Sequence, residues 1–203
     1  TPIMVDVLDD LTIDPVLVRS KITQRTKAII SVDIAGLPCN FNELIDVVKD
    51  PAIQRLFVPA CSRQKALNRI LLISDAAHSI GAFYEGIPAC LKCDVTIFSF
   101  HAVKNITTAE GGGVCLNLPS GFDNQEEYSF LKLYSLNGQN RDAFTKSIGG
   151  NWRYDILFKG FKMNMPDICA AIGLAQIRQY NNTLLPLRKE VFLRYCNGFK
   201  QHD

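Results

Sequence analysis

The sequence lacks the features that mark membrane, secreted and nucleic-acid-binding proteins. No apolar run approaches the roughly 18 to 20 residues that a membrane-spanning helix needs. The first residues, TPIMVDVLDD, lack the basic start and apolar core of a signal peptide. Lysine and arginine number 22 against 20 acidic residues, which gives a net charge of +2 with no long run of one sign. We therefore expect no membrane and no nucleic acid as partner.

The seven cysteines form no even disulfide framework, and a chain of 203 residues needs no such staples to fold. Reduced thiols in a cytoplasmic protein are the simplest interpretation. Cys90 and Cys93 form a C-x-x-C pair, but a structural zinc site needs four ligands and no second closely spaced pair exists. A redox pair usually opens a helix, whereas ACLKCDVTIFSF leads into a strand. We interpret both thiols as incidental and expect no metal.

The composition that is present, 47% hydrophobic and 21% charged, is typical of a packed globular protein. Short apolar runs rich in β-branched residues alternate with segments of helical spacing. The runs predict strands near residues 2–8, 27–34, 69–77, 94–100 and 112–117. The segments between and after them predict helices near 14–22, 41–50, 51–67, 124–138 and 166–185. This alternation predicts an α/β fold with a mostly parallel sheet covered by helices on both faces.

Two exits from the predicted sheet carry reactive side chains. Asp75 ends the run LLISD, with His78 shortly after it, and Lys104 follows the next strand in FSFHAVKN. Ligands of open α/β sheets bind at the carboxyl ends of the strands, so the acid and the amine should face one crevice. That combination suits pyridoxal phosphate, because the amine forms a Schiff base and the acid keeps the pyridine nitrogen protonated. Ser99 and loop N–H groups can hold the phosphate.

The same residues also have ordinary structural interpretations. An aspartate at the end of a strand is more often a cap or a turn former than a cofactor ligand. A lysine at such a position is usually solvated, and a lone histidine is usually structural. The glycines of EGGGV, residues 110–114, commonly mark a tight turn into a strand. The spacing of these residues leaves both interpretations open.

Three longer segments carry a resemblance to a known family. They are SDAAHSIGAFYEG, DVTIFSFHAVKNITTAEGGGVCLN and GFKMNMPDICAAIGLAQI. They resemble the DegT/StrS family of pyridoxal-phosphate-dependent nucleotide-sugar aminotransferases, in the same order and through nearly the whole chain. The resemblance implies the aspartate-aminotransferase-like fold, known as fold type I, with a large domain built on a mixed, mostly parallel sheet.

The resemblance also implies a role for each candidate residue. Lys104 would be the Schiff-base lysine and would move the proton in each half-reaction. Asp75 would pair with the pyridine nitrogen, and His78 would lie against the ring hydroxyl. Ser99 would bind the phosphate.

One further element is implied to come from a neighbouring subunit. The family's GYNYR element corresponds here to GFKMN, residues 160–164. Lys162 replaces the asparagine that usually contacts the phosphate, and a lysine can also donate to phosphate. The resemblance therefore implies a homodimer in which Lys162 reaches into the neighbour's site.

The family's organisation predicts what part of a larger architecture this chain represents. Members carry a phosphate loop before the region that matches and a small C-terminal domain after it. Residues 1–180 would be the central part of the cofactor-binding large domain, and residues 181–203 would begin the connection to the small domain. The implied substrates are glutamate as amino donor and a nucleotide-linked ketosugar as acceptor. SFHAVKNITTAEGG is nearest to members that aminate C4 of a UDP-linked 4-ketosugar.

Two other functions stay open at this point. Related ketosugar dehydratases use the same cofactor but carry histidine in place of the Schiff-base lysine, so Lys104 favours amino transfer. A cofactor-free fragment that acts as a binding or assembly module is the second alternative. A visible absorption band that appears with pyridoxal phosphate and is lost in Lys104→Ala would exclude it.

Overall fold

A computed structural model describes residues 1–140 and 153–200 of the chain. The chain divides into two compact units, one formed by Thr1–Asn117 with Asp167–Asp203 and the other by Leu118–Pro166. Residues 141–152 and 201–203, which fall in the predicted domains 1–180 and 181–203, lie outside the described residues. Each unit has its own arrangement of helices and paired backbone.

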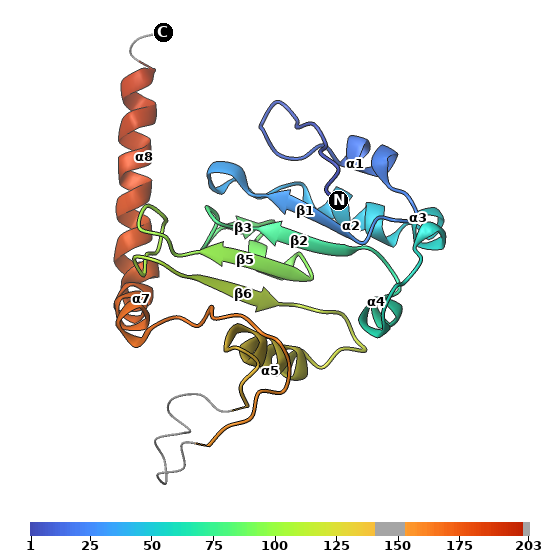
Figure 1. Cartoon of the computed structure of the whole chain (residues 1–203). Coiled ribbons are helices and arrows are strands. Elements are labelled where there is room, and N and C mark those ends of the chain that lie inside the picture. Colours follow the sequence, from blue (N-terminus) through green and yellow to red (C-terminus); the bar gives the residue numbers. More distant parts are fainter. Residues whose placement is uncertain (141–152, 201–203) are drawn as a thin grey trace. The chain divides into compact units, whose positions relative to one another are not determined.

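The first unit is built on a four-stranded sheet in the order β1–β2–β5–β6 (Figure 1). Its strands are β1 (Ala28–Val32), β2 (Leu71–Asp75), β5 (Val95–Ser99) and β6 (Gly112–Leu116). The first three run parallel, and β6 runs antiparallel to β5. A small antiparallel pair, β3 (Phe83–Tyr84) and β4 (Ile87–Pro88), lies apart from this sheet. The predicted α/β fold with a mixed, mostly parallel sheet is confirmed.

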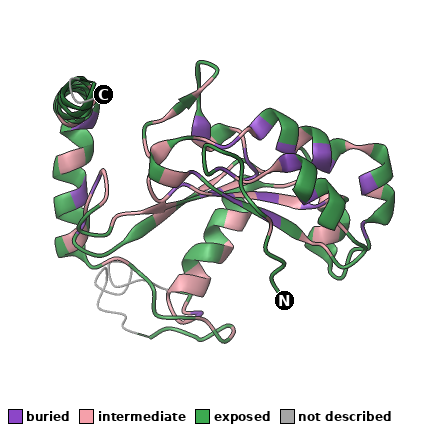
Figure 2. Cartoon of the chain, turned by 90° about the horizontal axis from the view of Figure 1, so that it is seen from above, coloured by how far each residue is buried: buried purple, intermediate pink, exposed green. Residues whose placement is uncertain are grey.

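One face of the sheet, here called the first face, is covered by helices α1 (Pro15–Lys21), α2 (Phe41–Lys49) and α3 (Pro51–Leu56) (Figures 1 and 2). Each begins at a side chain that accepts backbone N–H groups: Asp14, Asn40 and Asp50. The core between helices and sheet includes Val18, Ile29, Phe41, Leu44, Val48, Ile53, Ile70, Leu72 and Cys93. Burying one such large side chain contributes about 1.5–3 kcal/mol. Shorter elements complete this part: α4 (Ser62–Leu67), η1 (Ile34–Gly36) and η2 (Ala89–Leu91).

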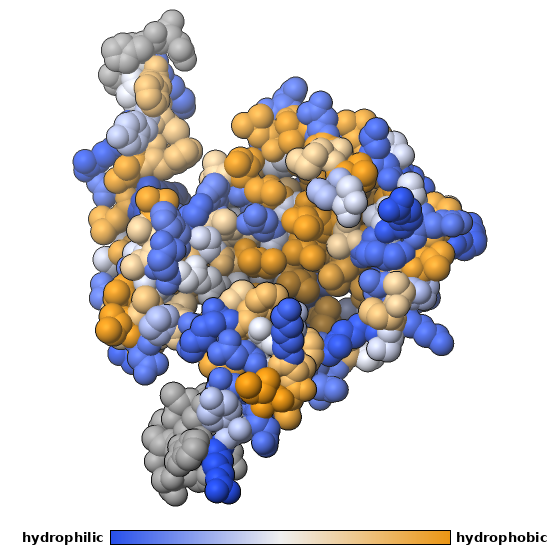
Figure 3. Space-filling view, in the orientation of Figure 1, coloured by the Kyte–Doolittle hydropathy of each residue, from blue (hydrophilic) through white to orange (hydrophobic). Residues whose placement is uncertain are grey.

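The second face of the sheet carries apolar residues that are exposed, so the prediction that helices cover both faces is not met within the described residues of this unit. Ile30, Val32, Ile97 and Val114 are 60%, 44%, 43% and 55% exposed, and Figure 3 shows apolar surface over the strands. The strand register aligns Val32 with Asp75, Asp75 with Ile97, and Ile97 with Val114. Aligned residues of neighbouring strands point to the same face. The side chain of Asp75 therefore lies on this exposed face.

The C-terminal part of the first unit is one long helical segment with an irregular middle. Helix α7 (Asp167–Gln179) is followed by wide π-type turns, η4 (Tyr180–Leu184), and by α8 (Leu185–Phe199). The single helix predicted at 166–185 is therefore wrong in its end. Pro186 has no N–H to donate to the preceding turn, which explains the irregular turns just before it.

The second unit pairs a helix with a returning segment. Helix α5 (Asn124–Ser135) begins at Asp123, whose side chain accepts two backbone N–H groups. The segment from residue 153 onward folds back beside residues 136–140, where backbone bridges join Leu136 to Lys162 and Gln139 to Ile156. Four aromatic rings hold the helix to this segment, with centroids 5.3–5.9 Å apart: Phe130, Tyr134, Phe158 and Phe161.

Two predicted elements differ from the structure. Residues 2–8 make no strand, because Leu8 N–H donates to the carbonyl of Thr12 and the segment turns back on itself. The helix predicted at 51–67 is interrupted between α3 and α4, where Pro59 disfavours helical backbone at the residue before it. Among the described residues, no helix has the length and apolar character that crossing a membrane requires.

Candidate active site

Three loops meet the carboxyl ends of the parallel strands. Residues 33–39 follow β1, residues 76–82 follow β2, and residues 100–111 follow β5. Lys104 lies in a turn of the third loop, in which its N–H donates to the carbonyl of His101 at 3.0 Å. The strand itself ends at Ser99, so Lys104 lies in the loop that follows the strand. The chain leaves the sheet after Ser99 because Phe100 N–H turns to the carbonyl of Gly111.

Lys104 and His78 are in contact. The amine nitrogen of Lys104 lies 2.6 Å from Nε2 of His78. The next residue in the same loop, Asn105, donates its side-chain N–H to the backbone carbonyl of His78 at 2.9 Å. The loops after β2 and β5 are therefore joined twice at this point. Both Lys104 and His78 are half-buried.

The other ring nitrogen of His78 is held by the loop after β1. Nδ1 accepts the backbone N–H of Ala35, from that loop, at 3.2 Å. The imidazole is therefore fixed between two loops, with Nε2 turned toward the Lys104 amine. An amine held in this way is a candidate for adding to a carbonyl group.

The side chains of Asp75 and Ser99 lie on the same face of the sheet but accept hydrogen bonds from different backbone N–H groups. Asp75 accepts the N–H of Ala77 at 3.1 Å, and Ser99 accepts the N–H of His101 at 3.4 Å. Ile97 aligns with Asp75, and Ser99 is two positions further along the same strand, so both polar side chains share the exposed face. Gly112 aligns with Ser99, and a Cβ there would lie 2.7 Å from the carbonyl oxygen of Phe98.

Lys162 belongs to the second unit. Its side chain is exposed, and its backbone forms the bridge to Leu136. Phe161, beside it, packs edge-on against Tyr134 at 5.3 Å. The structure therefore fixes the backbone of the GFKMN element within its own unit.

Sequence reasoning missed Asp33, the residue that follows β1. Its carboxylate is 1% exposed. It accepts the hydroxyls of Ser79 at 2.6 Å and Ser74 at 3.2 Å, and the N–H of Cys39 at 3.2 Å. Burial raises the pKa of Asp33 above its ordinary value, although these hydrogen bonds act in the opposite direction. The rule that singled out Asp75, an acid at the end of an apolar strand, also applies to SVD at residues 31–33.

The C-terminal helical segment forms hydrogen bonds with the loops after β2 and β5. Tyr180 is 5% exposed and donates its hydroxyl to the carbonyl of Ile80 at 2.7 Å, and burial raises the pKa of that hydroxyl. Gly81 has a φ of +81°, and a Cβ there would lie 2.6 Å from the Tyr180 ring. Arg188 donates to the backbone carbonyl of Lys104 at 3.3 Å. The positions of the His78 and Lys104 loops therefore depend on α7, η4 and α8.

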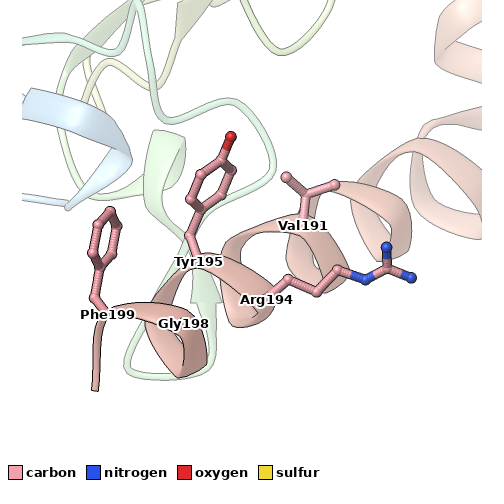
Figure 4. Close-up of a pocket in the computed structure, with 5 residues that line it drawn as sticks. All are labelled: Val191, Arg194, Tyr195, Gly198 and Phe199. Atoms are coloured by element: carbon pink, nitrogen blue, oxygen red, sulfur yellow. The ribbon is translucent and has the colours of Figure 1, made fainter. Parts of the chain in front are cut away.

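A shallow hollow elsewhere on the surface contains none of these residues. It is lined by Val191, Arg194, Tyr195, Gly198 and Phe199, all from α8 (Figure 4). Figure 4 shows the Val191, Tyr195 and Phe199 side chains extending to the same side of the helix. One helix encloses no cavity, and the hollow holds no acid, imidazole or lysine.

Comparisons with known proteins point to one family along the whole chain. The family description DegT/DnrJ/EryC1/StrS aminotransferase matches residues 1–57 and 58–203. The chain is 37% identical over 180 residues to the uncharacterized protein MJ1066 of Methanocaldococcus jannaschii, covering 88% of this chain and 41% of that protein. It is 30% identical over 203 residues to the spore coat polysaccharide biosynthesis protein SpsC of Bacillus subtilis, covering 99% of this chain and 46% of SpsC.

Solved structures agree. The putative sugar aminotransferase Spr1654 of Streptococcus pneumoniae, in its PMP form, is 42% identical with a TM-score of 0.89, covering 98% of this chain and 49% of Spr1654. Its PLP form gives a TM-score of 0.88 at 40% identity, with 98% and 48% of the two chains covered. Helicobacter pylori PseC, an aminotransferase involved in the biosynthesis of pseudoaminic acid, is 28% identical with a TM-score of 0.66, covering 89% of this chain and 40% of PseC.

These comparisons bear on both family and length. The chain spans about half the length of the relatives that it matches. Its own full length, in contrast, is covered by the family description. Its fold, with β1, β2 and β5 parallel, matches that of the putative sugar aminotransferase Spr1654. The chain belongs to the DegT/DnrJ/EryC1/StrS aminotransferase family.

Proposed function

We propose that the protein transfers an amino group from glutamate to a nucleotide-linked ketosugar, with pyridoxal phosphate held on Lys104. The observation that carries the proposal is the 2.6 Å contact between the Lys104 amine and Nε2 of His78, at the carboxyl edge of the sheet. A solvated or structural lysine would need no such partner. The contact holds the Lys104 amine in a fixed place, as a lysine that attacks a carbonyl group requires.

The residues present fit this cofactor by their chemistry. The cofactor needs an amine for its aldehyde, an acid for its ring nitrogen, and hydrogen-bond donors for its phosphate. Asp75 and Ser99 supply two of these groups from the ends of neighbouring strands β2 and β5, and Lys104 supplies the amine from the loop after β5. Asp75 and Ser99 share one face of the sheet, and that face is apolar around them, as a planar ring requires.

Each side chain then has a stated task. When bound, pyridoxal phosphate supplies an electron sink for the carbon that gains or loses the amino group. Lys104 would bind the cofactor's aldehyde and would carry the proton to and from the substrate carbon. Asp75 would accept a hydrogen bond from the ring nitrogen, His78 would orient the Lys104 amine and contact the ring hydroxyl, and Ser99 would donate to the phosphate.

The choice of substrate rests on the relatives and on the resemblance. Spr1654 is named a putative sugar aminotransferase, and SpsC is named for polysaccharide biosynthesis. The segment SFHAVKNITTAEGG is nearest to members that aminate C4 of UDP-linked 4-ketosugars. We therefore infer a UDP-4-ketosugar as acceptor. We also infer that the protein works in the cytoplasm, because its seven cysteines are free.

We further infer a homodimer with shared sites. Lys162 is exposed on the second unit, as a residue that serves a neighbour's phosphate would be. Residues 1–180 would belong to the large domain, and residues 181–203 would lead toward a smaller one. Mixing Lys104→Ala subunits with Lys162→Ala subunits tests the sharing, because some mixed dimers then contain one intact site. If subunit exchange is demonstrated, Lys162→Ala alone is inactive and mixing restores nothing, then Lys162 serves its own subunit.

Amino transfer itself is tested with isotope-labelled glutamate and a panel of nucleotide-linked 4-ketosugars, using the full-length protein. We expect label in the sugar amine with the wild type and none with Lys104→Ala. A sugar that loses a hydroxyl without gaining nitrogen would favour the dehydratase alternative instead. A protein that shows no visible absorption band with pyridoxal phosphate would favour the binding or assembly module.

A further inference from the structure

We propose that Asp33 is a positioning residue of this site: a buried carboxylate that holds the loop after β1 against the loop after β2 and thereby fixes the imidazole of His78. The inference deepens the proposed function and rests on it for its importance to catalysis. The geometry can be tested without it. Nothing in the reaction requires Asp33 to touch the substrate or cofactor.

Asp33 binds both loops at once. Within its own loop it accepts the N–H of Cys39 through Oδ1, at 3.2 Å. Toward the strand and loop of β2 it accepts the hydroxyls of Ser79 and Ser74 through Oδ2, at 2.6 Å and 3.2 Å. Its backbone N–H donates to the carbonyl of Asp75 at 3.0 Å. A single residue therefore joins the end of β1 to three positions around the end of β2.

The hydrogen bonds of Asp33 act on residues next to His78 and on the turn that contacts it. Ser79 is the neighbour of His78 in the chain, and the carbonyl of Asp33 accepts the N–H of Gly36, which closes the turn that presents Ala35. Gly36 has a φ of +89°, and a Cβ there would lie only 3.1 Å from the carbonyl oxygen of His78. The two loops thus lie so close together that a side chain at residue 36 would crowd this carbonyl. The N–H of Ala35 can reach Nδ1 of His78 only while that approach is kept.

Holding Nδ1 of His78 in place also orients the other ring nitrogen, Nε2. With the Ala35 N–H on Nδ1, the ring is held with Nε2 toward Lys104. If the loops separate, the ring can rotate, and the Lys104 amine loses its oriented partner. A carboxylate suits this task better than an amide. It accepts from every side, whereas one end of an amide would present its own N–H groups to the Ser79 hydroxyl or to the Cys39 N–H.

The competing explanation is that Asp33 is a purely structural buried acid. The sheet provides a matched control in Asp94, which is 7% exposed and lies at the opposite end, before β5. Asp94 pairs with Arg69 and has no contact with the His78 loop among the hydrogen bonds of the described residues. Replacing Asp94 with asparagine therefore removes a buried charge without touching the proposed positioning.

The test measures hydrogen exchange of the Ala35 amide in the cofactor-free, full-length protein. We expect Asp33→Asn to raise that exchange rate by about tenfold or more, relative to amides of β2. Ser79→Ala should raise it by a smaller factor, and His78→Ala, which removes the acceptor, should raise it at least as much as Asp33→Asn. Asp94→Asn should leave the ratio of the Ala35 rate to the β2 rates unchanged.

Each outcome decides the proposal. Unchanged Ala35 exchange in a folded Asp33→Asn protein overturns it, and so does an equal rise in Asp94→Asn, which would indicate general loosening. Should Asp33→Asn fail to fold, Ser79→Ala decides in the same way. A protein that shows the expected exchange pattern but transfers no amino group supports the positioning role and contradicts the proposed function. The two ideas therefore fail separately.

Discussion

The two ends of the central sheet treat buried carboxylates in opposite ways. At the amino ends of β2 and β5, Asp94 receives two hydrogen bonds from the Arg69 guanidinium at 2.6 Å and 2.7 Å, plus the Leu72 N–H at 2.9 Å. At the carboxyl end, Asp33 receives two hydroxyls and one N–H. Among the contacts of the described residues, no cation pairs with Asp33.

This difference distinguishes a buried carboxylate that stabilises the fold from groups that could take part in a reaction. The Arg69 and Asp94 side chains are only 14% and 8% exposed and satisfy each other bidentately. At the carboxyl end the groups that could react, Asp75 and Lys104, are half-buried and contact the Ala77 N–H and the His78 ring, respectively. Such contacts orient a reactive group without pairing it with an oppositely charged carboxylate or guanidinium. The comparison therefore predicts that substitutions at one end mainly change stability and that substitutions at the other mainly change activity.

The largest expected effect is at the carboxyl end. Lys104→Ala should reduce amino transfer by about 10²–10⁴-fold or more, because the chain loses both its covalent anchor and its proton carrier. The unfolding free energy should change by less than about 0.5 kcal/mol, since a half-buried loop side chain is removed. Steady-state rates and urea unfolding measure the two effects.

Lys21→Ala is the matched control, because Lys21 is exposed in the last turn of α1 and has no part in the site. It should alter neither quantity. Turnover of Lys104→Ala above a few per cent of wild type would contradict the role of Lys104 and, with it, the assignment of chemistry to this end of the sheet.

The opposite end should respond in stability. Arg69→Met leaves Asp94 buried without its cation, which costs about 3–5 kcal/mol of unfolding free energy. The matched control is Arg194→Met, which breaks an exposed helical pair whose side chains are 77% and 55% exposed. That change should cost less than about 0.5 kcal/mol. Equal losses in the two variants would remove the structural half of the comparison.

The sequence predicted much of this arrangement, for a physical reason. Strand order in an α/β sheet follows from apolar runs, and reactive residues at strand ends are readable as polar interruptions of such runs. The apolar runs indicate Asp75, Ser99 and Lys104 as polar residues at or after strand ends. The family resemblance implies a role for each of them and for His78. Asp33 followed the same pattern, yet its role depends on long-range hydroxyl partners, Ser74 and Ser79, that no spacing reveals.

The elements that could not be predicted depend on tertiary contacts or on proline geometry. Residues 2–8 have the alternation of a strand, but a strand needs a neighbouring backbone, and this segment pairs with its own turn at Thr12. Periodicity continues through residues 51–67 and 166–185, where Pro59 and Pro186 interrupt regular helical hydrogen bonding. The contact of His78 with Ala35 was invisible because its donor is a backbone group.

A smaller effect on activity is expected at Asp75. Asp75→Asn replaces a charge-assisted hydrogen bond with a neutral one, a loss of about 1.5–3 kcal/mol, so amino transfer should fall by roughly 10- to 100-fold. The cofactor should still bind, because Lys104 and Ser99 are unchanged. Cofactor absorption and single-turnover rates measure the two properties. A normal rate of proton removal from bound glutamate would show that Asp75 does not serve the ring nitrogen.

The smallest effect concerns the sign of the pH dependence of stability, and it compares an unpaired carboxylate with a paired one. Burial raises the pKa of Asp33 above 3.8. Hydrogen bonding from Arg19 and from the Ala52 N–H lowers the pKa of Asp50 below 3.8. Near Asp33, burial raises the pKa of Cys39 to about 11, and burial also raises that of Cys93, so both thiols stay protonated throughout the acidic range.

The two aspartates should therefore change stability in opposite directions. Folded Asp33 holds its proton more tightly than the unfolded chain, so its contribution falls as pH rises from 3.8 through its folded pKa, by about 1.4 kcal/mol per unit of pKa difference. Asp50 contributes stability that is present above 3.8 and lost as pH falls through its folded pKa. Urea unfolding of wild type, Asp33→Asn and Asp50→Asn from about pH 3 to pH 7 isolates each contribution as a difference from wild type. If the Asp33 difference instead grows with rising pH, as the Asp50 difference should, Asp33 is stabilised by charge pairing after all, and the contrast between it and the ion-paired carboxylates is wrong.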